Sequence, residues 1–194
     1  MSLNEREKSI SIENAIDEAN AVIAGLQGFA FPEPKTLRFN CSQLTDKYVK
    51  KLLEEVPAGH AKEFEGTDFI YTFKWLSEKA DEKAGISRLF REARELQAEE
   101  GYDGKVDYCK DNECLSQYLY VGRSKKLRSR LAQHLGARHE GIYAMHLQRW
   151  ATPISCDIDI SYYRIDGKAN LVIQAIEDGV WQTLQPMLGR QGEQ

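Results

Sequence analysis

The stretch YLYVGRSKKLRSRLAQHLG, residues 118–136, joins an aromatic strand to a helix through Gly122. Its first part is rich in aromatic and β-branched residues, as strands are, and the glycine ends it. In its second part leucines recur every four residues and form one apolar face of a helix. Five of the eight residues from Arg123 to Arg130 are Lys or Arg. The stretch therefore predicts a strand, a turn and a basic helix anchored by its leucines.

Two more strands are expected around this stretch. The segment DFIYTFKW (68–75) is aromatic and β-branched, and CDIDISYYRI (156–165) alternates through its first half. Helical patterns cover residues 78–100, a polar insert between the first two strands, and residues 169–188. The expected fold class is α+β, with a small three-stranded antiparallel sheet flanked by helices.

The first 60 residues are expected to form a helical N-terminal extension that precedes a main domain over residues 61–194. Two helices are predicted in the extension, over residues 12–24 and 45–56, and the prolines of FPEPKT break the chain between them. The apolar stripe of the first helix consists of Ile12, Ile16, Ala19 and Ile23.

Composition limits the classes of function. The formal net charge is -4, so the chain is not suited to coat nucleic acid indiscriminately, and any polyanion must bind a local patch. No segment approaches the length of a membrane span, and the first ten residues alternate charges where a signal peptide needs an apolar run. A cytoplasmic location is therefore expected by default. Cys109 and Cys114 are spaced too widely for a zinc knuckle, and reduced thiols are expected.

The helix after Gly122 carries the strongest polyanion signal. Its N-terminus offers unpaired N–H groups to a phosphate, and Arg130 and His134 lie four residues apart on one face, beside the leucine stripe. Between residues 121 and 150 seven Lys or Arg residues face one acid, a local balance of +6. The alternative is a solvated basic helix face, which is common.

The last predicted helix contains an unusual carboxylate. Glu177 lies in the otherwise apolar stripe of Ile173, Trp181, Leu184 and Leu188. A buried carboxylate must be paired or bind a metal. Opposite a basic helix, it suggests a metal ligand for phosphate chemistry. The alternatives are an ion pair with Arg130 or another arginine, and a helix rotation that exposes the carboxylate to solvent.

The order of these features resembles the GIY-YIG nuclease superfamily. The second motif is the YVG at residues 120–122, and Arg130 and His134 follow it at the spacing of the family. Glu177 falls where the metal-binding glutamate of the family does, and the resemblance covers roughly residues 67–190. It implies catalytic roles for Tyr71, Tyr120, Arg130, His134 and Glu177.

The first motif is less direct. A literal GIY at residues 141–143 follows YVG instead of preceding it, and it reads as part of a helix, so we interpret it as coincidental. FIY has the expected order and makes Tyr71 the counterpart, whereas Tyr108 is the rival candidate at a more ordinary hairpin distance. Gly189 stands where many members carry an asparagine.

The resemblance implies a metal-dependent DNA endonuclease. Glu177 would hold Mg²⁺ or Mn²⁺, Tyr71 would take the proton of the attacking water, and Arg130 would neutralise transition-state charge. The residues expected to grip neighbouring phosphates are Arg123, Lys126 and Arg128. One alternative is a catalytically inactive nucleic-acid-binding module of the same fold. Another is an interaction protein whose N-terminus and insert recruit a partner.

Overall fold

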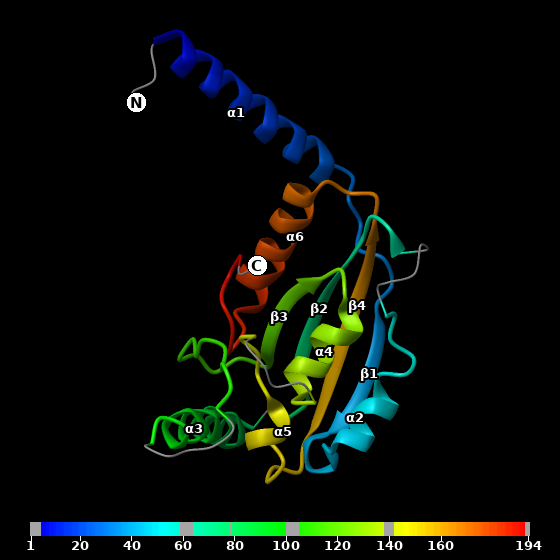
Figure 1. Cartoon of the computed structure of the whole chain (residues 1–194), viewed down its shortest axis with the longest axis vertical. Helices are drawn as coiled ribbons and strands as arrows, with labels where there is room; N and C mark the ends of the chain where they lie inside the picture. The colour runs from blue at the N-terminus through cyan, green and yellow to red at the C-terminus, as the bar shows by residue number, and fades with distance from the viewer. Residues whose placement is uncertain (1–4, 59–63, 78, 100–104, 138–141, 193–194) are drawn as a thin grey trace.

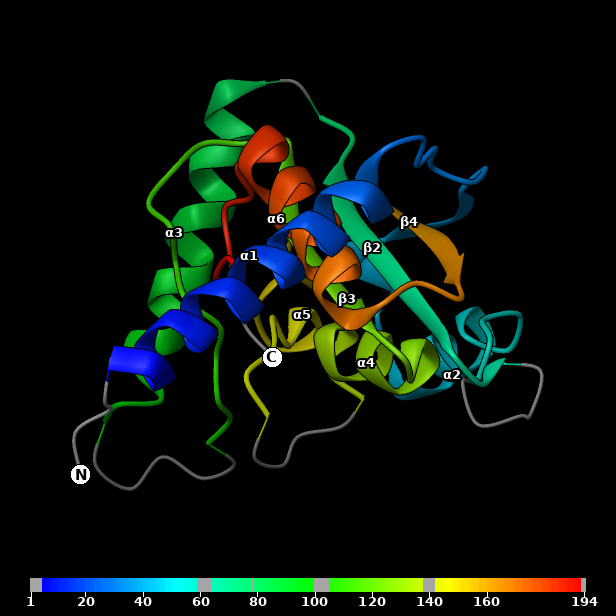
Figure 2. The same ribbon diagram turned by 90° about the horizontal axis from the view of Figure 1, so that it is seen from above.

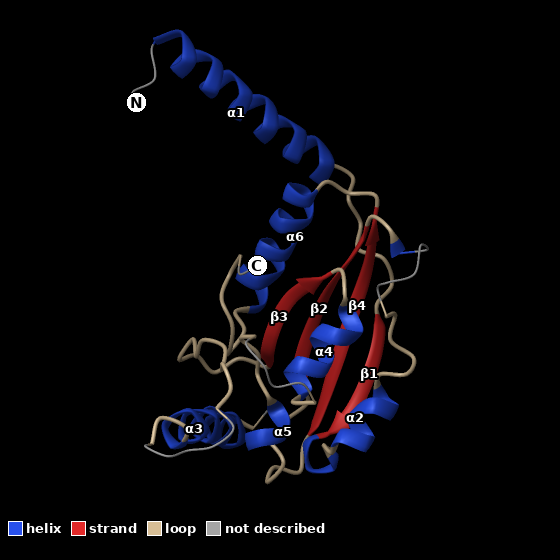
Figure 3. Cartoon of the chain, viewed as in Figure 1, coloured by secondary structure: helices blue, strands red, loops and turns tan. Residues whose placement is uncertain are grey.

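A computed structural model describes residues 5–58, 64–77, 79–99, 105–137 and 142–192 (Figure 1). The architecture is α+β, with one antiparallel sheet flanked by helices (Figure 3). In the described residues no helix is both long enough and apolar enough to cross a bilayer.

The sheet has four strands where the sequence predicted three. The three predicted strands are confirmed as β2 (Thr67–Trp75), β3 (Tyr118–Ser124) and β4 (Asp157–Asp166). The additional strand is β1 (Lys35–Asn40), and the strand order is β1-β4-β2-β3. Among the described residues, β3 therefore lies at one edge of the sheet, with β2 as its neighbouring strand.

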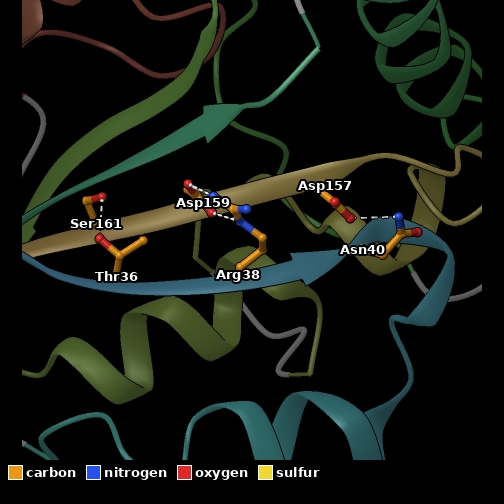
Figure 4. Close-up of polar contacts among 6 residues, drawn as sticks. All are labelled: Thr36, Arg38, Asn40, Asp157, Asp159 and Ser161. Atoms are coloured by element: carbon orange, nitrogen blue, oxygen red, sulfur yellow. Dashed lines mark hydrogen bonds and ion pairs between the residues drawn. The ribbon is translucent and has the colours of Figure 1, made fainter.

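The strand β1 corrects the prediction that residues 1–60 are only helical. Its alternation was masked by the prolines just before it: Leu37 and Phe39 pack on the core, while Thr36 points outward. The outward residues pair across to β4 in a polar ladder (Figure 4). The rungs of this ladder are Thr36–Ser161 at 3.1 Å, a two-bond pair between Arg38 and Asp159 at 2.7 and 2.8 Å, and Asn40–Asp157 at 2.9 Å.

Helices cover the two faces of the sheet unequally (Figure 2). One face carries the main core, where β2 residues Phe69, Tyr71 and Phe73 meet the leucines of α4 (Leu127–Leu135). The helices α2 (Asp46–Leu52) and α5 (Leu147–Trp150) also contribute to this core.

The opposite face of the sheet is covered by α6 (Asn170–Leu184). There Ile70 and Ile165 pack on Val172, Ile173 and Ile176. The helix α6 ends earlier than the predicted residue 188, because the following proline disfavours helical geometry at Gln185, whose φ is +43°.

The predicted helical insert is confirmed as α3 (Ala80–Leu96). It packs at one end of the molecule through Phe90, whose ring meets those of Tyr108 and Trp150 at centroid distances of 5.5 and 5.4 Å. At the other end, α1 (Glu5–Leu26) leaves the body beside α6 and projects away from it (Figure 1).

Candidate functional site at the edge of β3

The register of β2 and β3 brings two of the predicted site residues together. Tyr71 is the partner of Gly122, and its ring stacks on Tyr120 with centroids 6.2 Å apart and planes inclined by 12°. A Cβ on Gly122 would lie 2.7 Å from both Tyr71 Oη and Tyr120 Cε1. Glycine is therefore required at this position for the two rings to approach the edge strand.

The helix α4 adds His134, which is fully buried and packs against both tyrosine rings. Its Nε2 lies 3.1 Å from Tyr71 Oη, and its Nδ1 accepts a hydrogen bond from the Met145 N–H at 3.3 Å. Burial, with a smaller effect of Arg130, holds the pKa of His134 well below its ordinary value, so the imidazole is neutral. With Nδ1 accepting, the ring proton lies on Nε2 and is donated to the oxygen of Tyr71.

Tyr71 is a phenol in this environment. Burial raises its pKa well above the ordinary value of 10, and the nearby Arg130 opposes the shift. His134 donates to the Tyr71 oxygen and Arg130 lies close, so these two groups partly offset the cost of a negative charge on that oxygen. Tyr71 is therefore a phenol at neutral pH, with two donors placed to interact with its phenolate.

Arg130 lies one turn before His134 on the same face of α4, as predicted. One guanidinium nitrogen donates to Tyr120 Oη at 3.3 Å, and the other donates to Gln133 Oε1 at 3.1 Å. Its charge is permanent, and it lines a cavity with no carboxylate bonded to it among the described residues. Such a guanidinium is suited to a phosphate oxygen.

Glu177 enters the site from the other face of the sheet. Its Oε2 lies 3.3 Å from Arg123 Nε, and both side chains are nearly buried, at 7% and 11% exposure. Arg123 is itself held by the carbonyl and side-chain oxygens of Asn170 at 3.3 and 3.0 Å. Of the alternatives left open by the sequence, the structure gives an ion pair with an arginine, and that arginine is Arg123. The alternative of a helix rotation that exposes Glu177 to solvent is wrong, because Glu177 is buried.

Burial raises the pKa of Glu177 to about 7. Arg123 opposes this shift, whereas Asp178 and Asp68 add to it. Asp68 is a buried strand residue that lines the same cavity. The positive charge of Arg123 therefore does not fully offset the effects of burial and of the two nearby acids on the carboxylate.

The donor set fits a magnesium-type ion better than a zinc-type one. In the described part of the chain no group of three or more His, Cys, Asp or Glu side chains could enclose a metal. Glu177 Oε2 is buried and its contact with Arg123 is an ion pair without a hydrogen bond. Mg²⁺ is often held by one or two carboxylates, waters and substrate phosphate, so Glu177 fits that role.

One cavity of about 660 Å³ connects the residues from both faces of the sheet around the edge at Gly122. It is lined by all the predicted catalytic residues except His134, which lies behind Tyr71. The other charged or polar residues around it are Asp68, Arg123, Ser124, Lys125, Gln133, Tyr143, Asn170 and Arg190.

The three predicted phosphate-binding residues lie in different places relative to the cavity. Arg123 lines the cavity but is paired with Glu177, and Lys126 is exposed at the start of α4, outside the lining. Arg128 points away from the cavity and donates to the carbonyls of Val56 and Glu54 at 2.7 and 2.9 Å. Arg128 therefore links α4 to the segment that follows α2.

The two candidates for the first-motif tyrosine also lie in different places. Tyr108 packs on Phe90 and His146, outside the cavity, whereas Tyr71 lines it. The helix expected over the literal GIY is wrong: Gly141 lies outside the described residues, residues 142–146 are irregular, and α5 begins only at Leu147. Tyr143 consequently lies at the cavity, with its side chain largely exposed.

Gly189 has a structural reason for being a glycine. The segment after α6 runs beside β3, where the Leu188 N–H donates to the Leu119 carbonyl at 2.9 Å. The φ of Gly189 is +97°, and a Cβ there would lie 2.7 Å from the Tyr120 ring. An asparagine would not fit, and the polar neighbour that reaches the cavity is Arg190.

Sequence reasoning missed Asp68 and Asn170. An available signal for Asp68 was an acid within the apolar strand segment TDFIYTFKW, on the face opposite Tyr71. Asn170 gave no signal, because its role depends on how α6 starts relative to β3. Comparison with known proteins found no matching family model, no matching curated protein and no matching solved structure.

Proposed function

We propose that the chain is a metal-dependent endonuclease that hydrolyses phosphodiester bonds in DNA. The observation that supports the proposal is the cavity at the edge of β3, where two stacked tyrosines, an arginine and a buried glutamate converge and a buried histidine contacts Tyr71 from behind. These residues come from four separate elements. Packing alone does not require that so many polar groups meet at one glycine.

Tyr71 is the proposed proton acceptor for the attacking water. The phenol of Tyr71 first loses its proton to solvent. The His134 Nε2–H bond to its oxygen orients the resulting phenolate, which then accepts the proton of the attacking water and becomes a phenol again. Tyr120 positions Arg130 through its hydroxyl, at 3.3 Å. The guanidinium then lies where charge develops on the non-bridging phosphate oxygens.

Glu177 would hold the divalent ion, Mg²⁺ or Mn²⁺, together with water molecules. When bound, the ion supplies positive charge that stabilises the leaving 3′ oxygen. Arg123, which pairs with Glu177 in this structure, would then be available to bind a phosphate of the same DNA strand. Lys125 and Arg190 add positive charge to the cavity wall.

The second candidate is a catalytically inactive nucleic-acid-binding module. It is favoured by the pairing of Glu177 with Arg123, which gives the carboxylate a partner within the chain, and by the absence of a side chain at Gly189. In that case the cavity binds phosphate through its arginines and cleaves nothing.

Incubation of purified protein with supercoiled plasmid separates the two candidates. We expect nicking and linearisation with Mg²⁺ or Mn²⁺ and none with EDTA. The Glu177→Gln variant serves as the matched control against a contaminating nuclease. DNA binding without cleavage in any divalent ion, across double-stranded, single-stranded and branched substrates, would establish the inactive module instead.

A further inference from the structure

The helix α1 is exposed over most of its length. Every described side chain from Lys8 to Ala21 is exposed, and the helix meets the body beside α6, where Gly25 lies close against Val172 (Figure 1). A Cβ on Gly25 would be 2.5 Å from Val172 Cγ2. Isolated helices are only marginally stable in water, so most of α1 lacks the packing that helices usually need.

The exposed part of α1 carries a continuous apolar stripe. Its residues are spaced by four, three, four and three, which is the seam of a coiled coil. The stripe consists of Ile12, Ile16, Ala19, Ile23 and Leu26, and its four large members are 61%, 54%, 54% and 37% exposed. The acids Glu13, Asp17 and Glu18 lie outside it. Soluble proteins rarely leave such a stripe uncovered.

The stripe is nearly symmetric about Ala19. Ile12 and Leu26 lie seven residues before and after it, and Ile16 and Ile23 lie three before and four after. A second α1 running antiparallel would therefore place its Leu26 against Ile12 and its Ile23 against Ile16. The small side chain of Ala19 allows the two backbones to approach where they cross. A twofold interface requires this kind of self-complementary surface.

We propose that two copies of this chain associate through α1, antiparallel, with the twofold axis at Ala19. The occupant of the stripe is a second copy because the large residues lie in matched pairs on either side of the small Ala19, so that one stripe is the complement of another antiparallel to it. This inference does not rest on the proposed nuclease function.

A groove continues the stripe onto the body. Leu26 also lines a hollow of about 820 Å³ between α6 and the outer face of the sheet, together with Phe29, Phe31 and Tyr163. The stripe from Ile12 to Leu26 is about 21 Å long and a helix is about 10 Å wide, so the stripe alone covers roughly 210 Å² per copy. Stable interfaces bury about 800 Å² per partner. The first turns of the second α1 extend past Leu26 and supply further area over the groove.

Sedimentation velocity of the full chain over a concentration series tests the association. We expect a concentration-dependent dimer. The double variant Ile16→Glu/Ile23→Glu should weaken it by about a hundredfold or more, because four carboxylates would enter the interface. The matched control is Ile10→Glu, since Ile10 is 45% exposed on the opposite side of the same helix. A monomeric wild type, or equal effects of both substitutions, overturns the proposal.

Cysteine cross-linking tests the orientation. Ala19→Cys should form a disulfide between copies, whereas Ile12→Cys should not, because antiparallel Ile12 positions are about 21 Å apart and a disulfide spans less than about 7 Å between Cα atoms. The wild type is the background control, since Cys41, Cys109 and Cys156 are buried and Cys114 is partly so. Equal cross-linking at positions 12 and 19 indicates parallel helices and contradicts the antiparallel pair.

Discussion

The two sides of β3 solve the problem of burying polar groups differently. On the α4 side, the tyrosine half of the site (Tyr71, Tyr120, Arg130 and His134) contains one cation, bonded to neutral partners and backed by the leucine core. On the α6 side, the carboxylate half (Glu177 with Arg123) pairs two nearly buried opposite charges. Both halves reach one cavity only because Gly122 has no side chain between them.

This difference indicates which half of the site can bind a ligand without rearrangement. The tyrosine half is already organised: its histidine has one proton position, and its arginine keeps its full charge for an incoming anion. The carboxylate half must exchange a partner before Glu177 can bind a metal, because Arg123 occupies it. Separating a buried ion pair is costly when either charge is left uncompensated, so the exchange requires the ion to pair with Glu177 and a phosphate to pair with Arg123.

The largest expected effect is the loss of cleavage in Glu177→Gln. The amide keeps the shape of the side chain but not the charge that holds the ion, so activity should fall at least about a thousandfold while DNA binding persists. Plasmid cleavage and fluorescence anisotropy measure the two properties. If the variant lost thermal stability yet kept its activity per folded molecule, the carboxylate half would be purely structural.

The tyrosine half is tested by Tyr71→Phe. Removing the hydroxyl that His134 orients should lower the cleavage rate about a hundredfold or more, with binding unchanged. Tyr108→Phe is the matched control, because Tyr108 is buried against Phe90 outside the cavity. The opposite pattern, with Tyr108→Phe inactive and Tyr71→Phe active, would move the first motif to residue 108.

Arg130→Ala should act on turnover instead of affinity. The loss of a cation aimed at transition-state charge costs about a hundredfold in kcat. Lys126→Ala, at the exposed start of the same helix, should change the dissociation constant a few-fold and leave kcat intact, as expected for a positioning phosphate contact. A change in affinity alone for Arg130→Ala would make Arg130 a phosphate clamp.

Much of the fold followed from local patterns. The aromatic segments at residues 68–75 and 118–124 became β2 and β3, and the polar helix between them became α3. The strand β1 was missed because it is short, follows prolines and gains its stability from pairing with β4, which is a long-range contact. The stretch GIYAMHLQRW was predicted to be a helix, but of its described residues only Leu147–Trp150 are helical, as α5, and residues 142–146 are irregular.

The candidate site was predictable where it depends on local patterns and not where it depends on long-range contacts. Arg130 and His134 are four residues apart, so helical geometry alone places them together, and Tyr71 and Tyr120 follow from strand pairing. The partner of Glu177 depends on how α6 crosses β3, which no local pattern specifies. The same limit applies to Arg128, whose charge suggested DNA but whose guanidinium is used by the backbone of residues 54–56.

Arg123→Gln sharpens the contrast between the halves with a moderate effect. If Arg123 competes with the ion for Glu177, its removal should raise the affinity for Mn²⁺ several-fold, as measured by electron paramagnetic resonance without DNA. Lys125→Gln removes the same charge from the cavity wall without contacting Glu177, and it should change the affinity less. Weaker Mn²⁺ binding by Arg123→Gln would mean that Arg123 supports the metal site.

The smallest expected effect is on the pH dependence of stability, where the two halves act in opposite directions. The pKa of Glu177 is raised from an ordinary 4.5 to about 7, so its stabilising contribution is complete below pH 4.5 and is lost as pH rises to about 7. The pKa of His134 is lowered well below 6.5, so its contribution is complete above pH 6.5 and is lost as pH falls. Between pH 4.5 and 6.5 the two slopes offset each other in the metal-free protein.

In Glu177→Gln only the histidine slope remains of these two, and the free energy of unfolding should fall more steeply on acidification, by up to about 1.4 kcal/mol per pH unit. Urea unfolding in EDTA across this range measures the slope, with Glu18→Gln on exposed α1 as the control. Parallel curves for wild type and Glu177→Gln would mean that Glu177 is ionised in the folded protein at the same pH as in the unfolded chain.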